Sequence, residues 1–179
     1  MARGIILYRS KYGATQRYAG WLAEETGFDC VELKGAKPEL LDAYDTVVLG
    51  GGIYASGIAG LSFLKKNAGR LRGKRAAVFC VGASPYDEET FQALYRHNFT
   101  GGLDGIPCFY CRGAWEESKM NPVDRTLCRM MQKIVAKKDP NECEPWEKAL
   151  LSAGGGSCDW TDRESLRPLL DFLNGTSQA

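Results

Sequence analysis

The sequence predicts an α/β fold: a doubly wound sheet of five parallel strands in the order 2-1-3-4-5, with a helical insertion after the fifth strand. Short apolar runs alternate with amphipathic stretches along the chain. The runs are continuously apolar, as in Thr46–Leu49 and Ala76–Val81. Strands have this composition when helices cover both faces of a parallel sheet. Five strand–helix units in one chain are typical of the doubly wound arrangement.

The elements follow one another in regular alternation. Strands are expected at Arg3–Tyr8, Phe28–Leu33, Thr46–Gly50, Ala76–Val81 and Ile106–Arg112. Helices are expected at Ala14–Thr26, Ile58–Ala68, Glu88–His97 and Arg163–Leu173, with a short helix or turn at Pro38–Ala43. Gly27 is a plausible end for the first helix, since glycine adopts the left-handed conformation that follows many helices. Leu61, Leu64 and Ala68 recur at helical spacing and support the second helix.

Residues 115–162 do not fit a minimal sheet of five units. They separate the fifth strand from the last helix and contain two further helix candidates, Pro122–Lys138 and Pro145–Ala153. Asn121-Pro122 is a good helix start, because asparagine caps the first amides and proline suits the first helical position. We therefore expect residues 1–179 to form one domain that carries a helical insertion.

Composition is that of an ordinary globular protein. The chain has 179 residues and a formal net charge of +1. Its seven cysteines are an odd number at irregular spacing, which disfavours a secreted disulfide framework. A strand is expected directly after the first residues, so we expect no signal peptide, reduced thiols and a cytoplasmic location.

The loop after the first strand has the composition of a phosphate site. It consists of Ser10, Lys11, Tyr12, Gly13, Ala14 and Thr15, and it leads straight into a helix. Amides at a helix N-terminus attract anions, and hydroxyl groups add further donors. The loop lacks the lysine of a P-loop and the G-x-G-x-x-G of a dinucleotide site. We interpret it as a binding loop for a single phosphate group.

Two further loops follow the third and fourth strands. The first comprises Gly52, Ile53, Tyr54, Ala55, Ser56 and Gly57 after Gly50-Gly51, and the second comprises Gly82, Ala83, Ser84, Pro85 and Tyr86. Glycines permit close approach to a flat ligand, and the two tyrosines offer aromatic faces. Ordinary strand–helix turns have a similar composition, so the alternative is that these loops bind nothing. The order of the three loops at one sheet edge favours a ligand site.

The cysteines and the single histidine give no catalytic or metal site. Cys108 and Cys111 form a C-x-x-C inside an expected strand, where residues at this spacing point to opposite faces. We therefore expect two packed thiols. His97 has no serine or aspartate placed beside it, and the remaining cysteines lack metal-ligand spacing.

The first insertion helix is strongly basic. Its residues 122–138 carry five basic side chains and one acid, a net charge of +4 that leaves −3 for the rest of the chain. A basic band contains Arg125, Arg129, Lys133 and Lys137, and an apolar side contains Val123, Leu127, Met130, Met131 and Ile134. Such a helix either lies on an anionic membrane surface or packs its apolar side on the core.

The chain resembles the flavodoxin superfamily over nearly its whole length, and most of all the flavodoxin-type, quinone-dependent protoporphyrinogen oxidases. The matching segments are Ile5–Thr15, Val47–Tyr54, Phe63–Asn67, Gly113-Ala114 and the basic stretch from Asp124-Arg125 onward. The resemblance implies a flavodoxin-like sheet. It also implies FMN with its 5′-phosphate in Ser10–Thr15, although Tyr12 stands where the family has threonine.

In the oxidases, FMN takes electrons from a porphyrinogen and passes them to a membrane quinone. The resemblance therefore implies an FMN-dependent oxidoreductase or electron-transfer protein. Its partner would be a redox protein or a small-molecule electron donor or acceptor, with no nucleic acid and with peripheral membrane contact through residues 122–138. The alternative is a flavodoxin-like binding module that has lost its cofactor.

Overall fold

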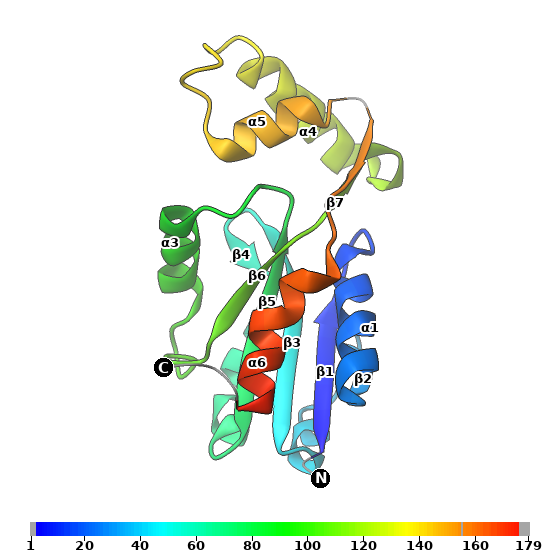
Figure 1. The fold of residues 1–179 in the computed structure, drawn as a ribbon, viewed down its shortest axis with the longest axis vertical. Coiled ribbons are helices and arrows are strands. Elements are labelled where there is room, and N and C mark those ends of the chain that lie inside the picture. The colour runs from blue at the N-terminus through cyan, green and yellow to red at the C-terminus, as the bar shows by residue number, and fades with distance from the viewer. Residues whose placement is uncertain (1–2, 155, 176–179) are drawn as a thin grey trace.

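A parallel sheet forms the centre of the computed structural model, which describes residues 3–154 and 156–175 (Figure 1). The sheet contains β1 (Gly4–Arg9), β2 (Asp29–Glu32), β3 (Thr46–Tyr54), β5 (Arg75–Gly82) and β6 (Cys108–Arg112). They pair in the order β2-β1-β3-β5-β6, and every pair on this path is parallel. The predicted fold class and strand order are confirmed.

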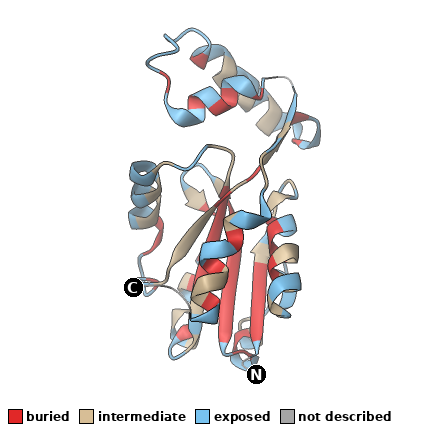
Figure 2. Cartoon of the chain, viewed as in Figure 1, coloured by how far each residue is buried: buried red, intermediate tan, exposed pale blue. Residues whose placement is uncertain are grey.

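Helices cover both faces of the sheet. On one face lie α1 (Ala14–Thr26) and α6 (Arg167–Asn174), and on the other lie the 3₁₀ helix η1 (Pro38–Ala43), α2 (Leu61–Lys66) and α3 (Glu88–Asn98). The strands between them are buried along most of their length (Figure 2). This double burial explains why the strands are continuously apolar.

Several expected element boundaries are wrong. The third strand does not stop at Gly50 but continues to Tyr54, and β4 (Gly57–Ile58) folds back against it as an antiparallel hairpin. The following helix therefore starts at Leu61, after Gly60 in the left-handed conformation, and a separate 3₁₀ helix η2 (Ala68–Leu71) follows it. The expected last helix is likewise divided into the 3₁₀ helix η4 (Arg163–Leu166) and α6.

The two cysteines of the C-x-x-C lie on opposite faces of β6, as expected. Cys108 packs in the cluster under α2 and α3, with its sulfur 3.7 Å from that of Cys80. Cys111 is buried in the cluster under α1 and α6. Burial raises the pKa of the Cys111 thiol. The pKa of Cys108 is raised by its hydrogen bond to Cys80 and by burial.

The insertion is a separate layer beyond the carboxyl edge of the sheet (Figure 1). It begins and ends in an antiparallel ribbon of β7 (Ala114–Glu116) and β8 (Ser157–Asp159), which the sequence did not predict. The ribbon carries the 3₁₀ helix η3 (Glu117–Lys119), α4 (Pro122–Val135) and α5 (Pro145–Ser152). A small cluster of Val135, Cys143 and Leu150 joins the two helices. No described helix is long and apolar enough to cross a membrane.

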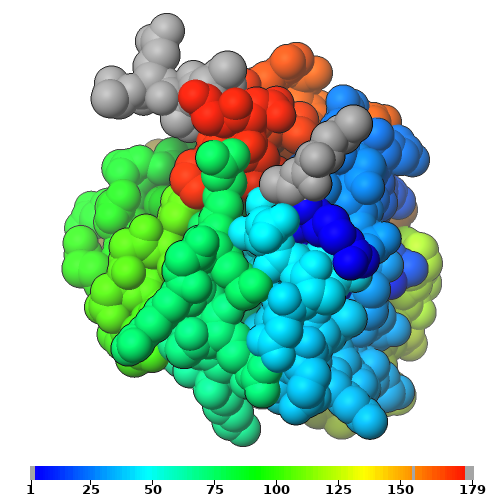
Figure 3. Space-filling model, turned by 90° about the horizontal axis from the view of Figure 1, so that it is seen from below, coloured from blue at the N-terminus to red at the C-terminus, as the bar shows by residue number. Residues whose placement is uncertain are grey.

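The segments that lead into β3 and β5 lie at the opposite edge of the sheet. Figure 3 shows them side by side in cyan and green, seen from the amino ends of the strands. The Arg70 guanidinium joins them through ion pairs with Glu39 and Asp42.

Gly50 and Gly51 serve packing rather than ligand approach, which corrects the expectation for this glycine run. Both lie within β3, fully inside the protein. A Cβ on Gly50 would overlap the Phe79 ring, and one on Gly51 would overlap the Ala59 carbonyl oxygen. The glycines let neighbouring groups reach the strand backbone.

We expect Gly51→Ala to lower the free energy of unfolding by about 1–3 kcal/mol, because the methyl group meets a backbone oxygen that cannot turn away. Urea unfolding followed by circular dichroism measures the change. Gly69→Ala is the matched control, since a Cβ there meets nothing within 4 Å. Equal free energies of unfolding for the two variants would show that the hairpin after β3 moves to make room for the methyl group without loss of stability.

Candidate functional site

A pocket of about 400 Å³ lies between the carboxyl edge of the sheet and the insertion. Four parts of the chain line it: the loop after β1, the hairpin after β3, the loop after β5, and the segment that runs from β6 into α4. Parallel sheets bind ligands at this edge, where the strand order reverses between β1 and β3. The volume falls in the range of roughly 300–1,000 Å³ that is common for small-molecule sites.

The loop after β1 presents the N-terminus of α1 to the pocket. Gly13 caps the helix with φ at 98°, and its N–H donates to Ser10 Oγ at 3.0 Å. The first intrahelical bond runs from the Arg17 N–H to the Gly13 carbonyl at 3.0 Å. The three amides before it, in residues 14–16, have no intrahelical partner. Together with the helix dipole they make this end of the pocket attractive to an anion.

The hairpin after β3 turns through two strained residues. Ala55 and Ser56 both have positive φ, 47° and 66°, which non-glycine residues rarely adopt. Asn98, at the end of α3, holds the turn with a buried side chain: its Nδ2 donates to the Ser56 carbonyl at 2.8 Å, and its Oδ1 accepts from the Ile58 N–H at 3.3 Å. A residue from another element therefore fixes the shape of this loop.

Tyr54 stands at the mouth of the pocket as an aromatic wall. Its side chain is 40% exposed, and the Lys11 ammonium lies 5.7 Å from the ring centroid. Gly52 lines the pocket beneath it, and a Cβ there would lie 2.7 Å from the Tyr54 hydroxyl oxygen. Partial burial raises the pKa of the Tyr54 phenol, so the ring is neutral and suited to stacking.

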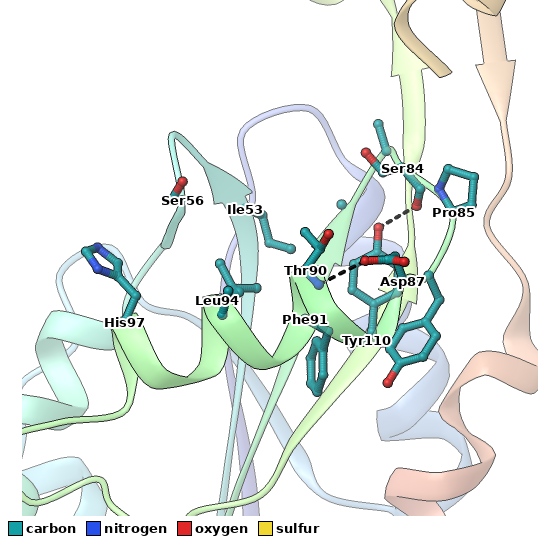
Figure 4. A pocket seen from close by; sticks show the side chains of 14 residues that line it. Ile53, Ser56, Ser84, Pro85, Asp87, Thr90, Phe91, Leu94, His97 and Tyr110 are labelled. Atoms are coloured by element: carbon teal, nitrogen blue, oxygen red, sulfur yellow. Dashed lines mark hydrogen bonds between the residues drawn. The ribbon is translucent and has the colours of Figure 1, made fainter. Parts of the chain in front are cut away.

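A second pocket of about 530 Å³ adjoins the first, with Ile53, Gly82 and Ala83 in both walls. Figure 4 shows it between the β3 hairpin and α3, with His97 at one end and Pro85 at the other. Tyr110 lines this pocket, and its hydroxyl donates to the Ser84 carbonyl at 2.5 Å. Because the two pockets share Ile53, Gly82 and Ala83 along the carboxyl edge, they are together called the groove below.

Tyr86 does not face Tyr54 across one ligand slot. Its ring packs against Phe91 and Tyr110, with centroids 5.6 and 5.8 Å apart, and lines the second pocket only from the α3 side. Its hydroxyl donates to the Glu88 carboxylate, and this bond raises the pKa of Tyr86 to about 12. The two tyrosines therefore belong to separate stretches of the groove.

The insertion supplies the remaining wall of the first pocket. The Asp124 carboxylate, in the first turn of α4, accepts hydrogen bonds from Lys11 and Tyr12. These two donors, Lys11 above all, hold the pKa of Asp124 below its usual value. Trp115 lines the same pocket, and its indole N–H is buried without a hydrogen-bond partner among the described residues.

Most residues predicted to bind a ligand lie in the groove. Ten line the first pocket: Lys11, Tyr12, Ala14, Thr15, Gly52, Ile53, Tyr54, Ala55, Gly82 and Ala83. Four others line only the second of these two pockets: Ser56, Ser84, Pro85 and Tyr86. Ser10, Gly13 and Gly57 line neither. For every residue in these three sets, a role in ligand binding stays a prediction.

Sequence reasoning missed the wall that the insertion contributes. Trp115, Met120, Asp124, Leu127 and Cys128 all line the first pocket. The position of the insertion after the last strand indicated a helix near this edge, but nothing in the sequence identified these side chains. Within residues 3–154 and 156–175, no group of histidine, cysteine or acidic side chains is arranged to hold a metal.

Residues 5–142 match a family model described as a flavodoxin domain. The chain belongs to this flavodoxin-domain family. Similar solved structures include a WrbA-like flavodoxin from Agrobacterium tumefaciens, with 20% identity, 70% of this chain and 88% of that chain covered, and a TM-score of 0.43. A flavoprotein from Lactobacillus acidophilus in complex with FMN has 16% identity, with 63% of this chain and 93% of that chain covered, and a TM-score of 0.42. The flavodoxin of Megasphaera elsdenii has 17% identity, with 60% of this chain and 82% of that chain covered, and a TM-score of 0.44. A search of curated proteins gives no match.

In this flavodoxin domain, we expect Asn98→Ala to lower the free energy of unfolding by about 1–3 kcal/mol, because it leaves the Ile58 N–H without its partner. Urea unfolding measures this loss. Asn67→Ala is the control, because the Asn67 amide donates only to the nearby Phe63 carbonyl at 2.8 Å. If both variants lose the same amount, the hairpin does not depend on Asn98.

Proposed function

We propose that this flavodoxin domain binds FMN and acts as an FMN-dependent oxidoreductase or electron-transfer protein. One observation carries the proposal: two adjoining pockets share Ile53, Gly82 and Ala83, and together they reach from the N-terminus of α1 to the space between the hairpin after β3 and the loop after β5. Family membership supports the same conclusion. The groove offers an anion site at one end and an aromatic wall further along, as a phosphorylated planar cofactor requires.

The loop after β1 fits the phosphate. The amides of residues 14–16 precede the first intrahelical bond, and Thr15 is buried beside them. The Ser10 hydroxyl accepts the Gly13 N–H through its oxygen and keeps its own proton to donate. These donors would hold a dianionic phosphate and fix one end of the cofactor.

The rest of the groove fits a flat ring system. Tyr54 supplies a face for stacking, and Trp115 adds a second aromatic side chain to the pocket wall. Gly82 has no side chain in the pocket, and a larger residue would not fit there, since a Cβ would lie 2.8 Å from the Tyr110 hydroxyl oxygen. When bound, the flavin supplies the redox chemistry. The protein positions the ring, and the insertion shields it from water.

The phosphate site is tested by the double variant Gly13→Val and Thr15→Ala. Valine strains a position whose φ is 98°, and alanine removes a buried hydroxyl from the loop. We expect FMN retention, measured by absorbance after desalting, to be lost. Thr26→Ala, at the far end of α1, is the control and should keep the flavin. A folded double variant that still binds FMN like wild type would place the phosphate elsewhere.

We propose further that the flavin passes its electrons to a quinone, with a porphyrinogen as the donor, as in the oxidases that the sequence resembles. Support comes from the apolar side chains of Met120 and Leu127 at the pocket, which suit a hydrophobic acceptor. Anaerobic reduction of the bound flavin by a porphyrinogen tests the donor, and anaerobic reoxidation of the reduced flavin by a panel of short-chain quinones and pyridine nucleotides tests the acceptor. We expect the quinones to react fastest. Failure of all quinones, with FMN still bound, would reject this acceptor alone.

A cofactor-free binding module is the second candidate. The Asp124 carboxylate lies against the phosphate loop and would repel a phosphate there, while Tyr12 replaces a small hydroxyl residue. The two candidates differ in a simple measurement. Protein that stays colourless after incubation with excess FMN and desalting supports the binding module.

A further inference from the structure

Helix α4 exposes an apolar stripe that no described part of the protein covers. Val123, Leu127, Met130 and Ile134 are 76, 50, 53 and 56% exposed. Their spacing places them on one side of the helix. The helix instead packs on α5 and its surroundings through Met131 and Val135. Of the two alternatives that the sequence left open, packing of the whole apolar side on the core does not hold for these four residues.

The basic band of α4 is largely engaged within the insertion. The Arg125 guanidinium donates to the carbonyls of Glu117, Ser118 and Met120. Arg129 forms an ion pair with the buried Glu117 carboxylate. These contacts shape the turn before the helix, so neither arginine is a free cation for an external partner.

Two lysines border the apolar stripe. Lys133 and Lys137 are exposed, and no ion pair is found for either among the described residues. At about 100° per residue, Lys133 lies on the side of the helix next to Met130, and Lys137 follows in the turn just after the helix ends at Val135. An apolar stripe with lysines along its border is the arrangement of helices that lie in a membrane interface.

We propose that α4 docks this protein on an anionic lipid surface, with the apolar stripe inserted among the acyl chains and Lys133 and Lys137 at the headgroups. The positive charge along the stripe favours an anionic lipid surface over a second copy of the protein. The two ammonium groups that border the stripe have no ion pair among the described residues, so two copies of the stripe would bring like charges together, whereas an anionic bilayer attracts the same surface.

Docking in this way turns the pocket toward the bilayer. Leu127 belongs both to the stripe and to the pocket wall, and Tyr54 stands at the same pocket. A lipid-soluble electron acceptor would therefore reach the pocket from the membrane. This consequence rests on the proposed function, whereas docking itself needs no flavin.

Co-sedimentation with vesicles tests the docking. We expect wild type, with or without FMN, to pellet with phosphatidylcholine vesicles that contain about a third phosphatidylglycerol, and to stay in solution with phosphatidylcholine alone. Val123→Gln/Met130→Gln/Ile134→Gln should weaken binding by roughly tenfold or more, because it removes the inserted groups but no charge.

Charge variants separate the lysines from nonspecific attraction. Lys133→Gln/Lys137→Gln should weaken binding and remove most of its salt dependence. The matched control, Lys37→Gln/Arg72→Gln, removes two exposed cations from the segments that lead into β3 and β5, and should bind like wild type.

Three results would overturn the proposal. Wild type that remains in the supernatant at low salt shows that α4 does not bind lipid. Unchanged binding of the glutamine triple variant shows that the stripe does not insert. A dimer in light scattering that dissociates in the triple variant assigns the stripe to a second copy. Because flavin-free protein is tested in parallel, each outcome is independent of whether FMN binds.

Discussion

Burial of β3 on both faces and along both edges is the constraint on which the rest of the structure depends. Residues 46–52 of this strand are all buried, and they pair with β1 on one side and β5 on the other. Such a strand has one workable register, because a slip by one residue would turn each side chain to the wrong layer. The loops after β1, β3 and β5 are thereby brought to one edge, where the groove forms.

The same strand shows how packing and site geometry are coupled. Gly50 accepts the Phe79 ring from the neighbouring strand, and Gly51 accepts the Ala59 carbonyl from the returning hairpin. The hairpin can fold back only because this space exists, and its fold-back holds Tyr54 at the pocket mouth. Asn98 then secures a turn whose positive φ angles are unfavourable by themselves. The aromatic wall of the pocket depends on groups that never contact a ligand.

Much of this could be predicted from the sequence, and the failures have physical causes. The bounds of α1 and η1 were predicted correctly, because Gly27 and Pro38 mark them with strong local signals. The hairpin was missed because Ala55 and Ser56 carry no turn signal, and the contact that stabilises them comes from a residue more than forty positions away. The ribbon of β7 and β8 was missed because each strand has three residues and its partner lies across the whole insertion. Short pairings of this kind depend on tertiary structure rather than local propensity.

The insertion illustrates a further limit of periodicity. Helical spacing groups Val123, Leu127, Met130, Met131 and Ile134 on one side of α4, but it cannot say how much of that side is covered. The small cluster around Val135 and Leu150 covers only part of it, and four apolar side chains stay exposed.

The contact between Asp124 and the phosphate loop links this surface to the pocket. The Lys11 ammonium forms an ion pair with Asp124 in the protein without a ligand, and a bound phosphate would compete with Asp124 for it. Tyr12 donates to the same carboxylate, so a ligand that drew Lys11 away would leave one of the two bonds from this loop to Asp124 in place. The loop after β1 thus contacts both the pocket and the first turn of α4.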